Sequence, residues 1–137
     1  MAIEIIKWDN TFSVNVEEID VQHKNIVNML NDLYSAFMSN AQEDQIEKIV
    51  SSMVDYTVYH FGTEEKYFRQ FKFQDSEEHI LEHNEFKKTV LHFQKQLEKN
   101  KAALTFEVIN FLRNWLLKHI AVSDKKYSKC FIDNGLT

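Results

Sequence analysis

The chain contains almost none of the residues that interrupt helices. Its 137 residues include no proline and only two glycines, Gly62 and Gly135. Strand-rich domains need turn residues roughly every 8–12 positions, and this chain has too few of them. We therefore predict an all-α protein.

Four segments carry apolar residues at alternating steps of three and four, the period of a helix that packs one face against a core. We expect helices at about residues 18–38, 43–70, 76–99 and 104–131, each to within about 2–4 residues. The short polar connections between them favour an antiparallel up-down-up-down four-helix bundle. Residues 1–16 lack the period and are expected to form an N-terminal arm of a single domain spanning 1–137.

Composition and charge exclude several classes of protein. The chain is 44% hydrophobic and 27% charged, which is typical of a globular domain. A net charge of -5 argues against nucleic acid or an anionic membrane as the main partner. No apolar run approaches the roughly 18 residues that span a bilayer. The N-terminal residues do not resemble a signal peptide, and the lone Cys130 suits a reducing compartment. We expect a cytoplasmic protein that is a monomer or a weak oligomer.

Polar side chains occupy positions in the apolar pattern where leucine or isoleucine would be expected. An isolated buried imidazole or carboxylate costs several kcal/mol unless it is paired, hydrogen-bonded or bound to a metal. A lone histidine in such a place is most often a satisfied core residue, but six substitutions need a common cause. They are His23, His60, Glu64, His79, His83 and His119.

Helix direction brings these residues together. They lie near the start of the first and third expected helices and near the end of the second and fourth, so an antiparallel bundle places them all at one end. Residues four apart share a helix face, which makes His60 with Glu64, and His79 with His83, suitable chelating pairs. Asp124 follows His119 by five positions, about 140° away on a regular helix. We predict a π-bulge or a local unwinding there if Asp124 joins the layer.

The residue types indicate a metal centre rather than another kind of site. Imidazoles and carboxylates without a thiolate exclude an iron–sulfur cluster or a cysteine-based zinc site. These side chains are too many for one ion, so we expect two. Iron, manganese, cobalt and zinc all remain compatible with this ligand set.

The same residues resemble the ligand set of the hemerythrins, and the flanking residues resemble the bacterial branch of that family. The resemblance covers essentially the whole chain. It is carried by Trp8-Asp9, Ile19-Asp20-Val21-Gln22-His23-Lys24, His60-Phe61-Gly62-Thr63-Glu64-Glu65, His79-x-x-x-His83, and His119 followed by Asp124-Lys125-Lys126-Tyr127.

This resemblance implies a non-heme di-iron centre. His79, His83 and His119 would bind one iron, and His23 and His60 the other. Glu64, Asp124 and an oxo or hydroxo group would bridge the two ions. One coordination position would stay open on the iron with two histidines, where O2 would bind reversibly. The resemblance and the helix register place Ile26, Trp115, Leu116 and Ile120 around that position, although each is also an ordinary core residue.

Three other kinds of function remain open beside O2 carriage, storage or delivery. One is an O2, redox or iron sensor, and another is iron storage. The third is a di-iron oxidase, peroxidase or NO-consuming enzyme. Bundle enzymes of the di-iron carboxylate type typically use Glu-x-x-His pairs, and this chain has none. We therefore expect a binding protein rather than an enzyme.

The remaining residues near the pattern have less specific interpretations. Asp20 and Gln22 could orient the histidines, and Asp20 could equally serve the start of a helix. Gly62 either admits another group to the cluster or faces solvent. Glu65 is expected on a solvated face, and His92 is expected not to be a ligand.

Overall fold

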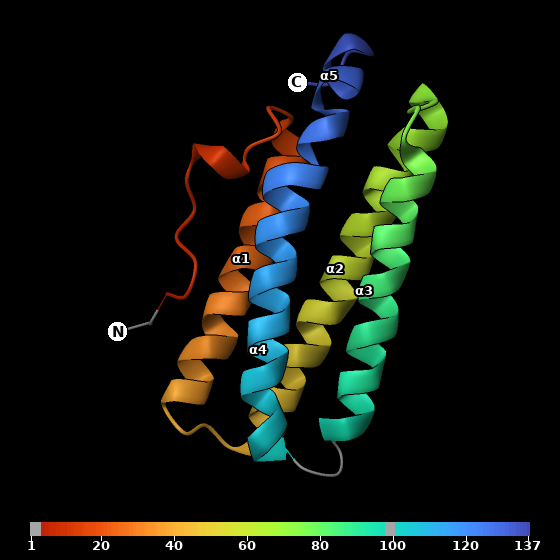
Figure 1. The fold of residues 1–137 in the computed structure, drawn as a ribbon. Coiled ribbons are helices and arrows are strands. Elements are labelled where there is room, and N and C mark those ends of the chain that lie inside the picture. Colours follow the sequence, from red (N-terminus) through yellow and green to blue (C-terminus); the bar gives the residue numbers. More distant parts are fainter. Residues whose placement is uncertain (1–3, 98–100) are drawn as a thin grey trace.

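The computed structural model describes residues 4–97 and 101–137, and in these residues all regular structure is helical. Figure 1 shows four long helices side by side, alternating in direction, which confirms the predicted antiparallel four-helix bundle. In chain order the elements are η1 (Asn10–Phe12), α1 (Glu17–Met38), α2 (Glu43–Phe71), α3 (Ser76–Leu97), α4 (Lys101–Lys118), the π-helical turn η2 (His119–Ser123) and α5 (Lys125–Asp133).

The helix bounds differ from the sequence expectation mainly in the last helix. The first three helices begin within a residue of the expected positions, while the expected end of the third, at 99, lies outside the described residues. The fourth begins at Lys101 rather than 104. It is interrupted by η2 and continues as α5 to Asp133.

Helix starts and ends follow from local chemistry. Acidic residues occupy the first turn of α1, α2 and α3, where they interact favourably with the positive end of the helix dipole. At the end of α2, Lys72 adopts the left-handed conformation with φ 53°, and the N–H of Phe73 donates to the carbonyl of Phe68 at 3.1 Å. This hydrogen bond satisfies a terminal carbonyl and turns the chain toward α3.

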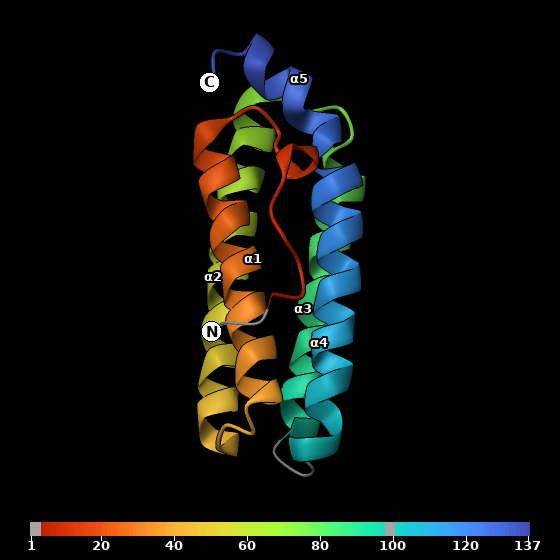
Figure 2. The ribbon, with the colours of Figure 1, turned by 90° about the vertical axis from the view of Figure 1, so that its left-hand side faces the viewer.

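The N-terminal arm is held against the bundle by two side chains of α1. Figure 2 shows the arm lying between α1 and α4. Asn31 accepts the N–H groups of Ile5 and Ile6 at 2.8 and 3.0 Å and donates to the carbonyl of Ile6 at 2.8 Å. Asp20 accepts from the Ser13 hydroxyl at 2.6 Å and the Val14 N–H at 2.8 Å. Asp20 therefore holds the segment that precedes α1 and does not orient a histidine.

The apolar core is divided into two clusters. The larger fills the bundle and includes Ile26, Phe61 and Ile120, while the smaller packs near α5 and includes Ile19 and Tyr127. Along α1, His23 lies between Ile19 of the small cluster and Ile26 of the large one. Along the η2–α5 segment, Asp124 likewise lies between Ile120 and Tyr127. A buried polar layer thus separates the two clusters.

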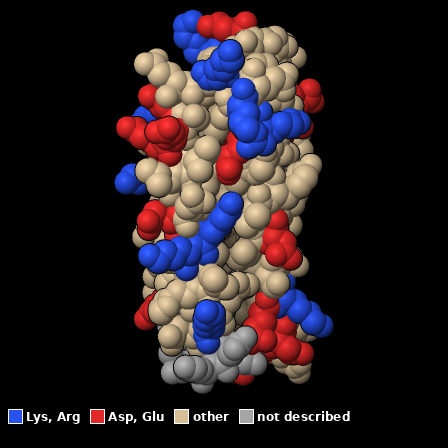
Figure 3. Space-filling model, turned by 90° about the vertical axis from the view of Figure 1, so that its right-hand side faces the viewer, with Lys and Arg blue, Asp and Glu red and all other residues tan. Residues whose placement is uncertain are grey.

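The outer surface mixes both signs of charge. On the side where α2 and α3 lie, basic and acidic side chains are interspersed with uncharged ones (Figure 3). Within the part of the chain that the structure describes, no helix combines the length and the apolarity needed to cross a bilayer.

The two glycines predict opposite responses to alanine. Gly62 is inside α2 on the exposed side, and an added Cβ would meet no atom within 4 Å. Gly62→Ala should therefore raise the free energy of unfolding by about 1 kcal/mol through helix propensity. Gly135 has φ +99°, so Gly135→Ala should cost about 1 kcal/mol. Urea unfolding of the metal-free variants measures both, and a destabilising Gly62→Ala would contradict the assignment of open space there.

Candidate metal centre

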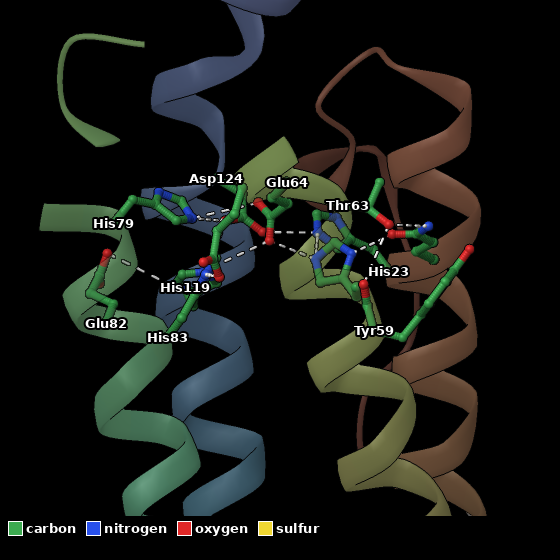
Figure 4. Close-up of polar contacts among 12 residues, drawn as sticks. His23, Tyr59, Thr63, Glu64, His79, Glu82, His83, His119 and Asp124 are labelled. Carbon is green, nitrogen blue, oxygen red and sulfur yellow. Dashed lines mark hydrogen bonds and ion pairs between the residues drawn. The ribbon is translucent and has the colours of Figure 1, made fainter. Parts of the chain in front are cut away.

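The structure brings the seven residues expected from the sequence into one buried layer. His23 comes from α1 and the pair His60 and Glu64 from α2. His79 and His83 lie in the first turns of α3, and η2 with the residue after it provides the last two (Figure 4). All seven are 0–3% exposed: His23, His60, Glu64, His79, His83, His119 and Asp124.

The distortion predicted between His119 and Asp124 is present. Residues His119–Ser123 form a π-helical turn, closed by a hydrogen bond of 2.8 Å from the N–H of Asp124 to the carbonyl of His119. The wider turn directs both side chains inward. It also leaves the apolar side chain of Val122 facing outward, 56% exposed.

The imidazoles form two groups. The three-imidazole group consists of His79, His83 and His119, and the two-imidazole group consists of His23 and His60. Potential ligand atoms lie within 4.8 Å of one another in two sets, Glu64 with the first group and Asp124 with the second. Each set has a composition that can hold a metal ion.

Both carboxylates reach across the two groups. Oδ1 of Asp124 lies 2.8 Å from Nε2 of His79, and Oδ2 lies 2.8 Å from Nε2 of His23. Oε1 of Glu64 lies 2.9 Å from Nε2 of His60 and 3.4 Å from Nε2 of His83. Each carboxylate therefore contacts imidazoles of both groups.

Buried nitrogen and oxygen atoms without hydrogen-bond partners face one another across this layer. Among the described residues, neither the four oxygens of Glu64 and Asp124 nor the Nε2 atoms of the three-imidazole group make a hydrogen bond, although their separations are short. Nε2 of His23 and Nε2 of His60 face each other at 3.1 Å. Ligands held about 2.1 Å from one ion at right angles lie about 3.0 Å apart. The donor set thus fits metal ions, because cations would satisfy atoms that are otherwise buried without partners.

The outer nitrogens of two imidazoles make hydrogen bonds that fix the ring orientation, and that of a third faces a carboxylate at longer range. Nδ1 of His60 donates to Oε1 of Gln22 at 2.6 Å, and Nδ1 of His83 donates to Oε2 of Glu65 at 3.0 Å. Nδ1 of His119 faces Oε2 of Glu82 at 3.9 Å, longer than a hydrogen bond. Glu65 is thus not the solvated residue expected from the sequence. Since Nδ1 carries the hydrogen in His60 and His83, Nε2 keeps its lone pair for a metal.

Burial and the charges in the layer shift the pKa values of these groups. Burial opposes the charged form of His79, but Asp124 and Glu64 outweigh it and raise the pKa of His79 to about 9. In the same way the pKa of His119 rises to about 10, chiefly because of Asp124. Despite their burial, Glu64 and Asp124 have pKa values well below the ordinary range because of the imidazoles. Burial lowers the pKa of His60.

Aromatic rings cover the three-imidazole group. Phe61 stacks on His83 with ring centroids 3.9 Å apart, and Trp115 stacks on His119 at 4.2 Å. Trp115 is half-buried and lines a surface pocket of about 250 Å³ with His119. It therefore lies over the three-imidazole group, whereas the sequence led us to expect it near the iron held by two histidines.

The other expected pocket residues lie in the large apolar cluster. Ile26, Leu116 and Ile120 are 1–2% exposed. Ile26 is three positions after His23 on α1, and Ile120 directly follows His119. His92 is exposed on α3, away from the layer.

Tyr127 is a buried polar residue to which the sequence alone assigned no place. It is 0% exposed, stacks on Phe131 and also contacts His79, with ring centroids 5.5 Å apart. Its hydroxyl makes no hydrogen bond with the described residues. Burial and the charges of Asp124 and Glu64 raise its pKa well above the usual value, so the phenol stays neutral. Its spacing of three from Asp124 was the signal that could have found it, because such a spacing shares a helix face.

Removing one imidazole tests the layer. His79→Ala should lose metal from the three-imidazole group, because the carboxylates cannot complete the ligand set. His92→Ala removes an imidazole from the exposed part of the same helix and should keep the full metal content. Metal per chain after loading with ferrous iron, measured by atomic emission, distinguishes them. Equal loss in both variants would refute the assignment.

Metal binding should release protons and invert the dependence of stability on pH. With pKa values of about 9 and 10, His79 and His119 are protonated in the metal-free protein at neutral pH and must lose those protons to bind metal. Both values lie above that of an unfolded histidine, about 6.5. The stability they contribute to the metal-free protein is present below pH 6.5 or so and is lost as pH rises through about 9–10.

Unfolding of metal-free and zinc-loaded protein across this pH range measures the effect. The stability gained from metal should increase with pH, and calorimetry in buffers of different ionisation enthalpy should show proton release. A gain from metal that is the same at every pH would contradict the protonated state of these two imidazoles.

Comparisons with known proteins agree with this geometry. The profile of the "Hemerythrin HHE cation binding domain" matches residues 14–130. A bacteriohemerythrin of Methylococcus capsulatus is 31% identical over 119 residues, covering 87% of this chain and 90% of that protein. A myohemerythrin of Theromyzon tessulatum is 32% identical over 124 residues, covering 90% and 92%.

Solved structures of hemerythrins also resemble this chain. A crystal structure of wild-type hemerythrin superimposes with a TM-score of 0.82 at 29% identity, covering 92% of this chain and 97% of the other. A hemerythrin point mutant gives a TM-score of 0.83 at 28% identity, covering 93% and 98%. With the profile matching most of the chain and the ligand layer in place, this chain belongs to the hemerythrin HHE cation-binding domain family.

Proposed function

We propose that this protein holds two iron ions in the buried layer and binds O2 reversibly there. The observation that carries the proposal is the composition of the layer. Five imidazoles and two carboxylates, all 0–3% exposed, form two unequal groups that share the carboxylates. The relatives of this chain also include bacteriohemerythrins and a myohemerythrin.

The two groups would hold one ion each. His79, His83 and His119 would bind the first iron, and His23 and His60 the second. Glu64 and Asp124 would bridge them, as their contacts with both groups favour. The second group has one imidazole fewer, so the vacant position for O2 belongs on its side. The iron pair would supply the electrons and the coordination position for reversible O2 binding.

The protein would contribute a dry, closed surrounding. Water and proton donors that reach a reactive metal centre promote side reactions, and a closed site limits them by exclusion. Ile26, Leu116 and Ile120 are almost fully buried beside the layer and offer no donor from their side chains. Their role is to admit a small apolar gas while keeping water out.

Carriage fits this ligand set better than oxidation chemistry. The di-iron enzymes built on helical bundles use Glu-x-x-His pairs and more carboxylates. Here imidazoles outnumber carboxylates among the seven inward-facing groups. Fewer anionic ligands should give less support to highly oxidised iron, which favours binding and release over turnover.

Exposure of the reduced protein to O2 tests the function. The protein is loaded with iron, reduced without air and then mixed with O2 while its visible absorption and resonance Raman spectra are recorded. We expect new bands, sensitive to the oxygen isotope, that disappear when O2 is removed and return when it is readmitted.

Two further outcomes complete this experiment. The zinc-loaded protein keeps the fold without redox chemistry and should show no O2-dependent band. Irreversible bleaching accompanied by oxidation of an added substrate would refute the carrier function and indicate an oxidase or a peroxidase.

A further inference from the structure

The groups behind the imidazoles differ in charge between the two sides of the layer. On the two-imidazole side, His60 donates its outer N–H to the neutral amide of Gln22 at 2.6 Å. On the three-imidazole side, His83 donates to the carboxylate of Glu65 at 3.0 Å. His119 faces a second carboxylate, that of Glu82, at 3.9 Å.

These outer partners are fixed in place by contacts of their own. The Gln22 amide is 5% exposed and donates through Nε2 to the Thr63 hydroxyl at 3.3 Å, which identifies its oxygen as the atom facing His60. Glu82 accepts a hydrogen bond of 2.8 Å from the hydroxyl of Ser123, in the π-helical turn. The Glu65 side chain is only 19% exposed. The difference in charge is therefore a property of the packed structure.

A carboxylate that accepts the outer N–H of a ligating imidazole increases the basicity of the ligand, whereas a neutral amide does so less. We propose that the hydrogen bond from His83 to Glu65, with the charge of Glu82 nearby, makes the three-imidazole position the more electron-donating one, and that Gln22 keeps the two-imidazole position the poorer donor. Gln22 and Glu65 act as positioning and tuning residues through the imidazoles that they hydrogen-bond, and Glu82 acts on His119 through its charge at 3.9 Å. The inference rests on the proposed di-iron function.

The consequence is a difference between two ions that share both carboxylates. The richer donor set would stabilise an oxidised ion held at the three-imidazole position. The poorer donor set would leave an ion held by His23 and His60 more electron-deficient, which would favour binding of a further ligand there. The charge pattern thus reinforces the inequality that the count of imidazoles already creates.

Reciprocal exchange of the two partners tests the proposal. Glu65→Gln removes the charge behind His83 while keeping the shape, and Gln22→Glu adds one behind His60. The double variant Gln22→Glu/Glu65→Gln keeps the net charge of -5, so it reports the place of the charge rather than its amount. Glu85→Gln removes an exposed carboxylate from the α3 pocket beside His119 and is the matched control.

The midpoint potential of the iron-loaded protein is the first readout. Glu65→Gln should weaken the preference for ferric over ferrous iron about tenfold, which raises the potential by about 59 mV for a one-electron couple. Gln22→Glu should lower the potential. Glu85→Gln should leave it near that of the wild type.

Zinc binding is the second readout and needs neither iron nor O2. Glu65→Gln should weaken zinc affinity by about tenfold. In the zinc-loaded proteins, the imidazole 15N shifts of His83 and His60 should move in opposite directions in the double variant. If Glu65→Gln changes potential, affinity and shifts no more than Glu85→Gln does, the proposal is wrong.

The two proposals fail in distinguishable ways. Gln22→Glu buries a charge and can impair folding. Glu65→Gln buries no new charge, so this variant alone is sufficient to test the tuning proposal. Iron protein that never binds O2 reversibly would refute the carrier function, while the zinc readouts would still test the outer partners. Reversible O2 binding with unchanged zinc affinity in Glu65→Gln would refute only the tuning.

Discussion

Ligand-type nitrogen and oxygen atoms that face one another inside an apolar bundle are the constraint on which this structure depends. Nε2 atoms and carboxylate oxygens meet at 2.8–3.5 Å in a layer that solvent barely reaches. Without protons or metal ions between them, such a layer would cost far more than a typical domain stability of about 5–15 kcal/mol allows. The shifted pKa values of His79 and His119 show how protons compensate when metal is absent. Such a core therefore requires positive charge in the layer, whether from protons or from metal ions.

The π-helical turn is the local distortion that completes this layer. A regular helix would leave Asp124 about 140° from His119, and one of the two could not face the layer. The wider turn solves this and exposes Val122, a β-branched apolar residue, to solvent. After this turn, α5 places Tyr127 and Phe131 in the smaller apolar cluster, which covers the layer on the side away from the larger cluster. The distortion is therefore stabilised by the packing on both sides of it.

The sequence was sufficient for contacts within a helix and for the depth of each residue, but not for contacts between helices. The helical period and the short connections predicted the bundle and the shared layer, and the spacing of five between His119 and Asp124 predicted the distorted turn. All three follow from the spacing of residues along the sequence. Which side of the layer Trp115 covers depends on how α4 is rotated against α3. Likewise, Glu65 of α2 faces His83 because of the way in which α2 packs against α3. Neighbouring charges on a helix look alike in sequence whether they face water or an imidazole.

The outer contacts join ligand geometry to helix packing. Gln22 of α1 holds His60 of α2, Glu65 of α2 holds His83 of α3, and Glu82 of α3 faces His119 in η2. Each contact thus runs from one element of the bundle to another. A change in the packing of any such pair would rotate an imidazole, and a bound ion that fixes the imidazole would in turn fix the pair. Metal binding and bundle assembly should therefore be coupled through these few contacts between elements, which help a small domain to orient its ligating groups without rigid loops.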